Sequence, residues 1–404
     1  MHRVVITGMG AVTPLGHSAI DTWAGMREGR VAIGPISTLP AESLRFGIAA
    51  EVKNFNPLDH FDEKRLLLLD RISQFALVAA REAVAQAGID FSLDGIGENT
   101  AVIIGSGVGG EQTHDAASRR LYGENNPRTH PLTIVRQMTN APACHISIEH
   151  QLNGPAFAVV SACASANHAL AQAFHMVRSG VADAALAGGT EASITLGVVK
   201  AWEAMRVMAD DTCRPFCKQR RGMVLGEGAG VFVLETLEHA QRRGATILAE
   251  FVGAGMSADA GDIVFPSEAG AARAIGRALA DGGLDVGDVD YINAHGTGTP
   301  GNDPTETRAI RRVFGEQADR IAVSSTKSMH AHALGAAGAI ELVAVIGALR
   351  DGVLPPTMNF IDPDPDCDLD YVPNVARDMD VRAALSNSFA FGGLNAVVAL
   401  RRAP

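Results

Sequence analysis

The chain has 404 residues, of which 47% are hydrophobic and 20% are charged, so it can bury one large core or two medium ones. Its formal net charge of −11 argues against nonspecific nucleic-acid binding, which depends on a basic surface. No apolar run reaches the length of a membrane span. The N-terminus passes directly into an apolar strand, Val4–Gly8, without the features of a secretory signal. We therefore expect a cytoplasmic protein. Five cysteines, an odd number, do not form a disulfide framework.

Short apolar runs that end in polar or glycine-rich turns recur along the chain, and alanine-rich stretches follow them. The predicted strands are Val4–Gly10, Ala101–Gly107, Ala156–Val160, Ala184–Gly189, Val289–Ala294 and Ile321–Ser324. The stretches between them have helical spacing, for instance Ile72, Phe75 and Ala79. This alternation predicts an α/β fold in which helices pack on sheets.

Two segments follow the same plan. One is a strand, a turn with Cys163 and a helix of small residues; the other is a strand, a turn with Lys327 and His332 and a second such helix. The similarity predicts two related halves, residues 1–250 and 251–404. Strand–turn–helix similarity is common by chance, so other features have to support it.

Cys163 lies in the sequence Val160–Ala166, which is made of small residues. A free cysteine is usually a small buried hydrophobe. At a strand-to-helix turn, however, the sulfur meets the unpaired N–H groups and the positive end of a helix, which favour a thiolate. The small neighbours also leave room for a substrate. We therefore predict that Cys163 is a nucleophile with a lowered pKa.

Two further loops carry polar groups at predicted strand ends. His295 precedes a glycine-rich loop, and Lys327 and His332 precede a helix. One histidine alone could be a satisfied core residue, but active groups in α/β folds gather where strands end. We expect these three side chains and Cys163 at one pocket. Near the C-terminus, Phe391 and two glycines after it predict a loop whose backbone approaches a ligand.

Two other patterns do not predict sites. The glycine-rich stretch Gly105–Gly110 lacks both the dinucleotide fingerprint and the Gly-Lys-Ser/Thr ending of a phosphate loop. Cys213 and Cys217 have no second pair of ligands nearby in the sequence, so we expect no zinc there. No cofactor and no metal are expected.

At this point the chain resembles the β-ketoacyl-acyl carrier protein synthases, in particular the type II elongating branch. The motifs that carry the resemblance are Val5–Gly10, Cys163, Gly188–Glu191, Val224–Gly230, His295, Lys327 with His332, and Phe391–Gly393. The resemblance implies a thiolase-like, five-layered αβαβα fold built from two similar halves, and a dimer. It also implies a ketosynthase that joins malonyl-acyl carrier protein, with loss of CO2, to an acyl chain on a cysteine.

The resemblance assigns roles to residues. Cys163 would carry the acyl chain, and His295 and His332 would stabilise the enolate left by decarboxylation. Lys327, paired with Glu306, would keep His332 uncharged. The remaining roles concern the substrate. Phe391 would be a mobile gatekeeper whose backbone N–H joins that of Cys163 in an oxyanion hole, Thr297 and Thr299 would hold the phosphopantetheine arm, and Phe389 and Gly392 would contact substrate.

The chain also departs from the housekeeping pattern. Ala390 and Leu394 replace a usual glycine and threonine, and Leu66–Leu69 occupies a stretch that is more basic in housekeeping enzymes. These departures are more similar to specialised synthases of aryl polyene, nodulation-factor or type II polyketide pathways, and suggest a dedicated carrier protein or a partner subunit. The basic residues expected to dock an acidic carrier are Lys200, Arg206, Arg214, Lys218, Arg220 and Arg221.

Two alternatives remain open. A chain-length partner subunit shares the fold but lacks the cysteine, so retention of Cys163 with His295, Lys327 and His332 argues against it. A coenzyme A-dependent thiolase needs a second acid–base cysteine late in the chain. Cys367 is the candidate, but its acidic neighbours disfavour a thiolate.

Overall fold

The computed structural model describes residues 1–93 and 95–404. Its main feature is a ten-stranded sheet in the order β11-β10-β14-β15-β9-β1-β8-β6-β4-β5. The strands of one half are β1 (Val4–Val12), β4 (Thr100–Gly105), β5 (Ala156–Val159), β6 (Ala184–Glu191) and β8 (Gly228–Thr236). Those of the other are β9 (Ala249–Ala258), β10 (Tyr291–Asn293), β11 (Ala322–Ser324), β14 (Ala383–Ala390) and β15 (Leu394–Arg402).

The two sets of five strands have the same internal plan. In each set the outer three strands are parallel and the inner two are antiparallel. The sets meet through a short antiparallel pairing of Val4–Ile6 with 249–251. The predicted boundary after Glu250 therefore falls inside β9, at the junction itself. The predicted strands are present with shifts of a few residues at their ends, and β8, β9, β14 and β15 are additional.

Helices form three layers around the two half-sheets. The helices of the first half are α1 (Ala19–Arg27), α2 (Glu63–Leu66), α3 (Arg71–Ala87), α4 (Glu111–Ser118), α5 (Thr133–Gln137), α6 (Ala141–His150), α7 (Ser165–Ser179), α8 (Leu196–Met205) and α9 (Leu237–Arg242). Those of the second are α10 (Glu268–Gly282), α11 (Asn302–Phe314), α12 (Lys327–His330) and α13 (Ala337–Asp351). Short sheets join β2 (Gly34–Pro35), β3 (Ile48–Ala50) and β7 (Leu225–Gly226), and β12 (Val353–Leu354) with β13 (Arg377–Asp378).

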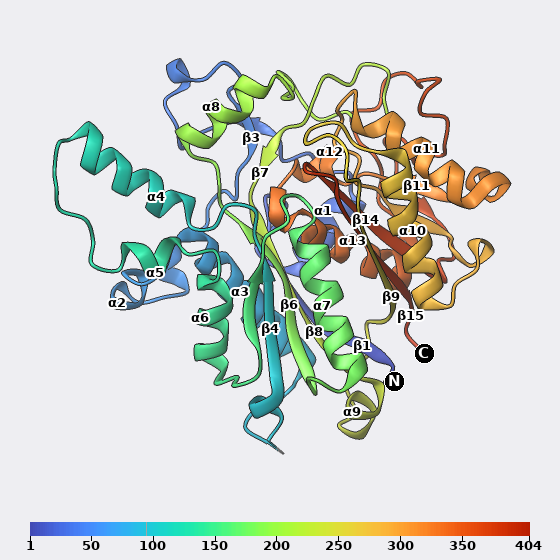
Figure 1. Cartoon of the computed structure of the whole chain (residues 1–404), viewed down its shortest axis with the longest axis horizontal. Coiled ribbons are helices and arrows are strands. Elements are labelled where there is room, and N and C mark those ends of the chain that lie inside the picture. The colour runs from blue at the N-terminus through green and yellow to red at the C-terminus, as the bar shows by residue number, and fades with distance from the viewer. Residues whose placement is uncertain (94) are drawn as a thin grey trace.

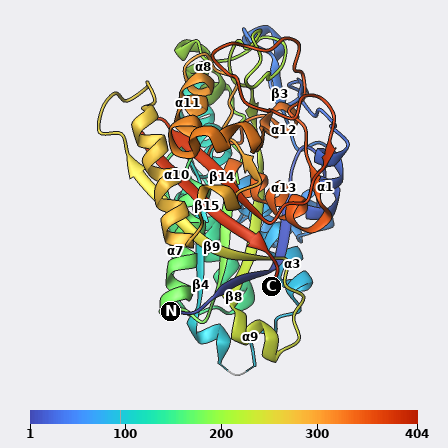
Figure 2. The ribbon, with the colours of Figure 1, turned by 90° about the vertical axis from the view of Figure 1, so that its right-hand side faces the viewer.

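The layers follow from which helices contact which strands. Helix α3 covers the outer face of β1 and β8, and α10 covers β9 and β15 (Figures 1 and 2). Helices α7 and α13 contact each other and strands of both halves, so they form the central layer. The order is helix, sheet, helix, sheet, helix, and the expected five-layered α/β fold of two similar halves is confirmed.

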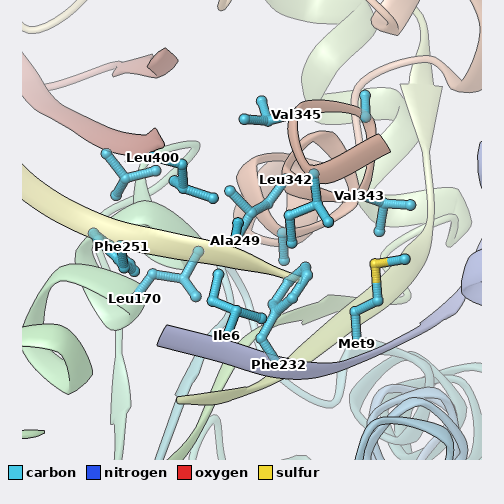
Figure 3. Close-up of a cluster of buried hydrophobic side chains, with 14 of the residues drawn as sticks. Ile6, Met9, Leu170, Phe232, Ala249, Phe251, Leu342, Val343, Val345 and Leu400 are labelled. Atoms are coloured by element: carbon cyan, nitrogen blue, oxygen red, sulfur yellow. The ribbon is translucent and has the colours of Figure 1, made fainter. Parts of the chain in front are cut away.

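The central layer has to be apolar all round because sheets cover it on both sides. Every residue from Ala337 to Leu349 in α13 is buried. Figure 3 shows side chains of this core, with Leu342 of α13 near Ile6 and Phe232 of the first half. Small residues allow the close packing: a Cβ at Gly230 would lie 2.7 Å from the carbonyl oxygen of Ala339. The one charged residue within this apolar stretch is Glu341, and it belongs to the site below.

Among the residues that the structure describes, no helix is both long and apolar enough to cross a bilayer. All five cysteines are free.

Candidate active site

Cys163 occupies the tight turn between β5 and α7, as predicted. The preceding residue, Ala162, has φ +47°, a left-handed conformation that is uncommon for a residue with a side chain. Ser165 stabilises the turn, because its hydroxyl accepts from the N–H of Ser161 at 2.9 Å and donates to the carbonyl oxygen of Ala162 at 2.7 Å. The cysteine thus projects from a rigid turn just before the first residues of α7.

His295 and His332 come from the second half. His295 follows β10, and His332 follows β11 and the short helix α12. The carboxyl ends of parallel strands meet at one edge of a sheet, so both histidines face the same region. The N–H of His332 donates to the carbonyl oxygen of Val224 at 2.8 Å, and its own carbonyl oxygen accepts from Gly226 at 2.9 Å. The second histidine is therefore tied to β7 of the first half.

The thiol and the two imidazoles converge. The sulfur of Cys163 and ring nitrogens of His295 and His332 all lie within 4.8 Å of one another. The two rings are 5.3 Å apart between centroids and nearly perpendicular, at 82°. All three residues line one cavity of about 200 Å³. A Cys-His-His set can also bind a metal such as Zn²⁺, although the Lys327 ammonium behind it opposes a cation.

The cavity collects most of the other expected residues. Thr297 and Thr299 line it and their hydroxyl oxygens are 2.9 Å apart. Phe389 and Phe391 also line it, from the end of β14 and the turn that follows. Gly392 is not a lining residue, and its N–H donates to the carbonyl oxygen of Ile263 at 2.8 Å. The structure thus brings a thiol, two imidazoles, two hydroxyls and two aromatic rings to one surface.

Lys327 does not line the cavity, and the expectation that it pairs with Glu306 is wrong. Its ammonium forms a buried ion pair with Glu341 of α13 and donates to the carbonyl oxygen of His295 at 2.7 Å. Glu306 instead accepts the N–H groups of His295 and Gly296, both at 2.8 Å. Each carboxylate has its own task, because one neutralises the ammonium and the other positions the His295 loop.

Glu341 was missed in the sequence although a signal was present. It is the one charged residue in the buried stretch Ala337–Leu349, which makes up most of helix α13. A charge cannot be buried there without a partner. That requirement points to a buried cation, and Lys327 is the fully buried lysine it meets.

Burial and Lys327 decide the charge of the two imidazoles. Desolvation lowers the pKa of both His295 and His332 well below 6.5, and the nearby ammonium lowers it further. Both rings are therefore neutral near pH 7. Both nitrogens of His332 and Nδ1 of His295 are buried without a protein hydrogen-bond partner among the described residues. Neutral, unpartnered imidazoles can donate an N–H to a substrate oxygen.

The predicted lowering of the Cys163 pKa is wrong. The side chain is only 5% exposed, and burial raises the pKa of its thiol to about 12 even though the Lys327 ammonium opposes this. Loss of solvation outweighs the helix N-terminus because the helix end is itself inside the core. The resting sulfur is therefore a thiol, and its attack requires a nearby proton acceptor, which the neutral imidazoles provide.

The basic residues are also only partly as expected. Arg214 and Arg220 form ion pairs with Asp211 and Asp364 and are largely covered. Arg206 and Arg221 are exposed, and both line the mouth of the cavity. Lys200 pairs with Glu203, and Lys218 is exposed without lining the cavity. Cys367 lies outside the cavity as well.

Sequence comparisons are consistent with this geometry. Residues 1–240 match the family described as "Beta-ketoacyl synthase, N-terminal domain", and residues 248–361 match "Beta-ketoacyl synthase, C-terminal domain". The chain is 52% identical over 400 residues to "Nodulation protein E" of Rhizobium sp. (strain N33), covering 99% of both chains. It is 43% identical over 407 residues to "3-oxoacyl-[acyl-carrier-protein] synthase 2" of Staphylococcus aureus (strain N315), covering 99% of this chain and 98% of that one.

A solved structure extends the similarity to the whole fold. "The ishigamide ketosynthase/chain length factor" superposes with a TM-score of 0.95 at 36% identity and 100% coverage of both chains. The shared family and the shared fold agree with the arrangement of the cavity.

The Lys327–Glu341 pair makes a first prediction. Lys327→Met or Glu341→Leu alone leaves a buried, unpaired charge and should cost about 3–5 kcal/mol of unfolding free energy. The double variant should cost much less than the sum, since neither charge remains. Denaturant unfolding of the four proteins measures the coupling. Coupling of Lys327→Met to Glu306→Gln that exceeds its coupling to Glu341→Leu would contradict the assignment.

The neutral imidazoles make a second prediction, on pH dependence. An ordinary histidine gains its proton as pH falls through 6.5, but a lowered pKa keeps the folded imidazole neutral below that value. Decarboxylation of malonyl-carrier should therefore be flat from about pH 8 down to about pH 6. A rate that halves near pH 6.5 would show that the rings titrate normally. Circular dichroism over the same range controls for unfolding.

Proposed function

The chain belongs to the β-ketoacyl synthase family, and we propose that the cavity formed by Cys163, His295 and His332 is where it carries out this family's chemistry. As a ketosynthase it is an acyltransferase that condenses malonyl-acyl carrier protein with an acyl chain to give 3-oxoacyl-acyl carrier protein. The single observation that supports the site is the convergence of one thiol and two neutral imidazoles within 4.8 Å. No residue of this set is close to another in the sequence.

The first half-reaction loads the enzyme. The sulfur of Cys163 attacks the carbonyl carbon of an acyl thioester, and the new S–C bond replaces the bond to the carrier's sulfur. The thiol proton passes through a neutral imidazole to the departing carrier sulfur. A proton acceptor is needed because burial holds the thiol pKa near 12. The backbone N–H groups of Cys163 and Phe391 would stabilise the oxyanion of this step.

The second half-reaction forms the carbon–carbon bond. The malonyl C–C bond breaks and CO2 leaves. The electron pair of that bond forms a thioester enolate, whose oxygen accepts hydrogen bonds from the ring N–H groups of His295 and His332. The α-carbon then attacks the acyl carbonyl, and the Cys163 sulfur leaves as a thiolate, which takes up one proton from solvent to restore the thiol. Neutral donors suit this role, because they stabilise the enolate without protonating its carbon. The hydroxyls of Thr297 and Thr299 line the side of the cavity where a phosphopantetheine arm would lie.

We propose a specialised pathway rather than housekeeping fatty-acid synthesis. The identity to Nodulation protein E (52%) exceeds that to 3-oxoacyl-[acyl-carrier-protein] synthase 2 (43%). Ala390, where a glycine is usual, packs in the same apolar cluster as Cys163 and Leu394. Of the Leu66–Leu69 stretch, Leu67 is 56% exposed and Leu69 is buried, so an apolar contact with a dedicated carrier protein would depend on Leu67.

A second subunit would complete the molecule. Strand β5 is an edge strand of the large sheet. Phe157 within it is 37% exposed, and Val160, directly after it, is 59% exposed. An unpaired apolar edge is a template for pairing with another chain. We propose that a second thiolase-like subunit, identical or a chain-length subunit, covers this edge. The shared plan of the two strand sets also supports residues 1–250 and 251–404 as duplicated halves.

The test of the proposed chemistry separates the two half-reactions. Cys163→Ala should abolish condensation while decarboxylation of malonyl-carrier persists, because both imidazole donors remain. His295→Ala and His332→Ala should each lower decarboxylation about 100- to 1000-fold. The measurement supplies malonyl-carrier with a ladder of acyl primers and weighs the carrier-bound products, which also reports chain length. Condensation by Cys163→Ala would contradict the assignment.

Carrier docking makes a separate prediction at the mouth of the cavity. Arg206→Glu with Arg221→Glu should slow transacylation from an acidic carrier roughly 10-fold at low salt and reduce its salt dependence. Arg242→Glu is the control, because Arg242 is an exposed residue at the end of α9 that does not line the cavity. Equal rates for the double variant and the control would exclude these arginines as the docking site. A pantetheine-bound acyl substrate should be unaffected.

A further inference from the structure

Phe391 and Trp202 form a pair inside the cavity. Their ring centroids are 5.8 Å apart and their planes are 25° from parallel, which is a stacked arrangement. Both rings are half-buried and both line the cavity that contains Cys163. No sequence pattern connects the two residues, because Trp202 lies in α8 and Phe391 lies after β14.

Trp202 belongs to a fixed element. The next residue, Glu203, is buried and accepts the N–H groups of Arg45 at 2.6 Å and Phe46 at 3.0 Å. Lys200 donates to the same carboxylate at 2.8 Å. These bonds tie the last turn of α8 to the loop that precedes β3, so the indole has little freedom to move with the substrate.

Phe391 belongs to an element that can move. Gly392 and Gly393 follow it with φ of +79° and +68°, conformations that glycine adopts at little cost. The turn is attached to its surroundings by backbone bonds from Gly392 to Ile263 at 2.8 Å and from Asp259 to Gly393 at 2.9 Å. Of the two stacked rings, Phe391 is therefore the one that can leave.

The size of the cavity requires the ring of Phe391 to move away from Trp202 when substrate binds. During condensation the malonyl arm has to reach the imidazoles through the cavity mouth while an acyl chain already occupies the sulfur. A volume of about 200 Å³ leaves the chain little space unless a side chain beside Cys163 moves. From this geometry we infer that Trp202 is a positioning residue that holds Phe391 closed and sets which acyl chains can load. The inference rests on the proposed function of Cys163.

The test uses the small number of tryptophans. The chain has two, and Trp23→Phe removes the other, a residue of α1 that is 8% exposed. In that background the full-length protein is treated with iodoacetamide or with N-octyl iodoacetamide. Each forms an S–C bond at Cys163, with loss of iodide and of the thiol proton to solvent. Peptide mass spectrometry measures labelling, and the emission of Trp202 measures the stack.

The octyl reagent should change the emission of Trp202 as it labels Cys163, and iodoacetamide should not. Phe391→Ala should remove the difference. Trp202→Ala should speed octyl labelling about 2- to 10-fold, as expected for loss of an aromatic pair, without changing the rate with iodoacetamide. Trp202→Phe should restore most of the slow rate. Thermal unfolding of each variant controls for stability.

Three results would overturn the inference, and the third would also overturn the proposed function. Two of them would exclude Trp202 as the residue that holds Phe391 closed and would leave Cys163 as the nucleophile. These are full octyl labelling of Cys163 with unchanged emission, and equal octyl labelling rates in Trp202→Ala and the parent. Failure of both reagents to label Cys163 in every variant would overturn the proposed nucleophile, and with it the role of Trp202.

Discussion

The site depends on one buried ammonium. Lys327 is fully buried and neutralised by Glu341 from the central helix, and it also holds the carbonyl oxygen of His295. Burial lowers the pKa of both imidazoles, and the positive charge of Lys327 lowers it further. The same charge partly offsets the cost of ionising the Cys163 thiol. One cation thus favours neutral donors for the enolate and, to a smaller degree, a negative sulfur. Without the five-layered core around it, such a charge could not be buried at all.

The fold explains why residues from both halves are needed. Cys163 follows a strand of the first half, and His295 and His332 follow strands of the second. The layered arrangement brings these strand ends to one cavity because α7 and α13 pack between the half-sheets and contact both. His332 is tied to β7 of the first half through Val224 and Gly226. The position of His332 therefore depends directly on how the two halves pack together.

Much of this was predictable from the sequence, for reasons that are local. Cys163, His295 and His332 each follow an apolar run and precede a turn, and the rule that active groups gather at strand ends was enough to expect a shared pocket. Motif order does not identify the partner of Lys327, because Glu306 and Glu341 are both near it in sequence. The sequence signal for Glu341 is its place in the apolar stretch of helix α13, where a buried carboxylate needs a cation. The prediction of a lowered Cys163 pKa was wrong for a similar reason. The helix end can be predicted from the sequence, but the degree of burial cannot. The sequence also does not show that Arg214 and Arg220 form ion pairs, because the fold brings their acidic partners Asp211 and Asp364 to them.

The chemistry requires both imidazoles to be neutral, and NMR of protein labelled with ¹⁵N-histidine measures their protonation directly. Spectra of His295→Asn and His332→Asn identify the two rings among the 13 histidines. We expect ring-nitrogen shifts of neutral imidazole for both at about pH 6, where an ordinary histidine is largely charged. Imidazolium shifts for either ring at that pH would contradict it.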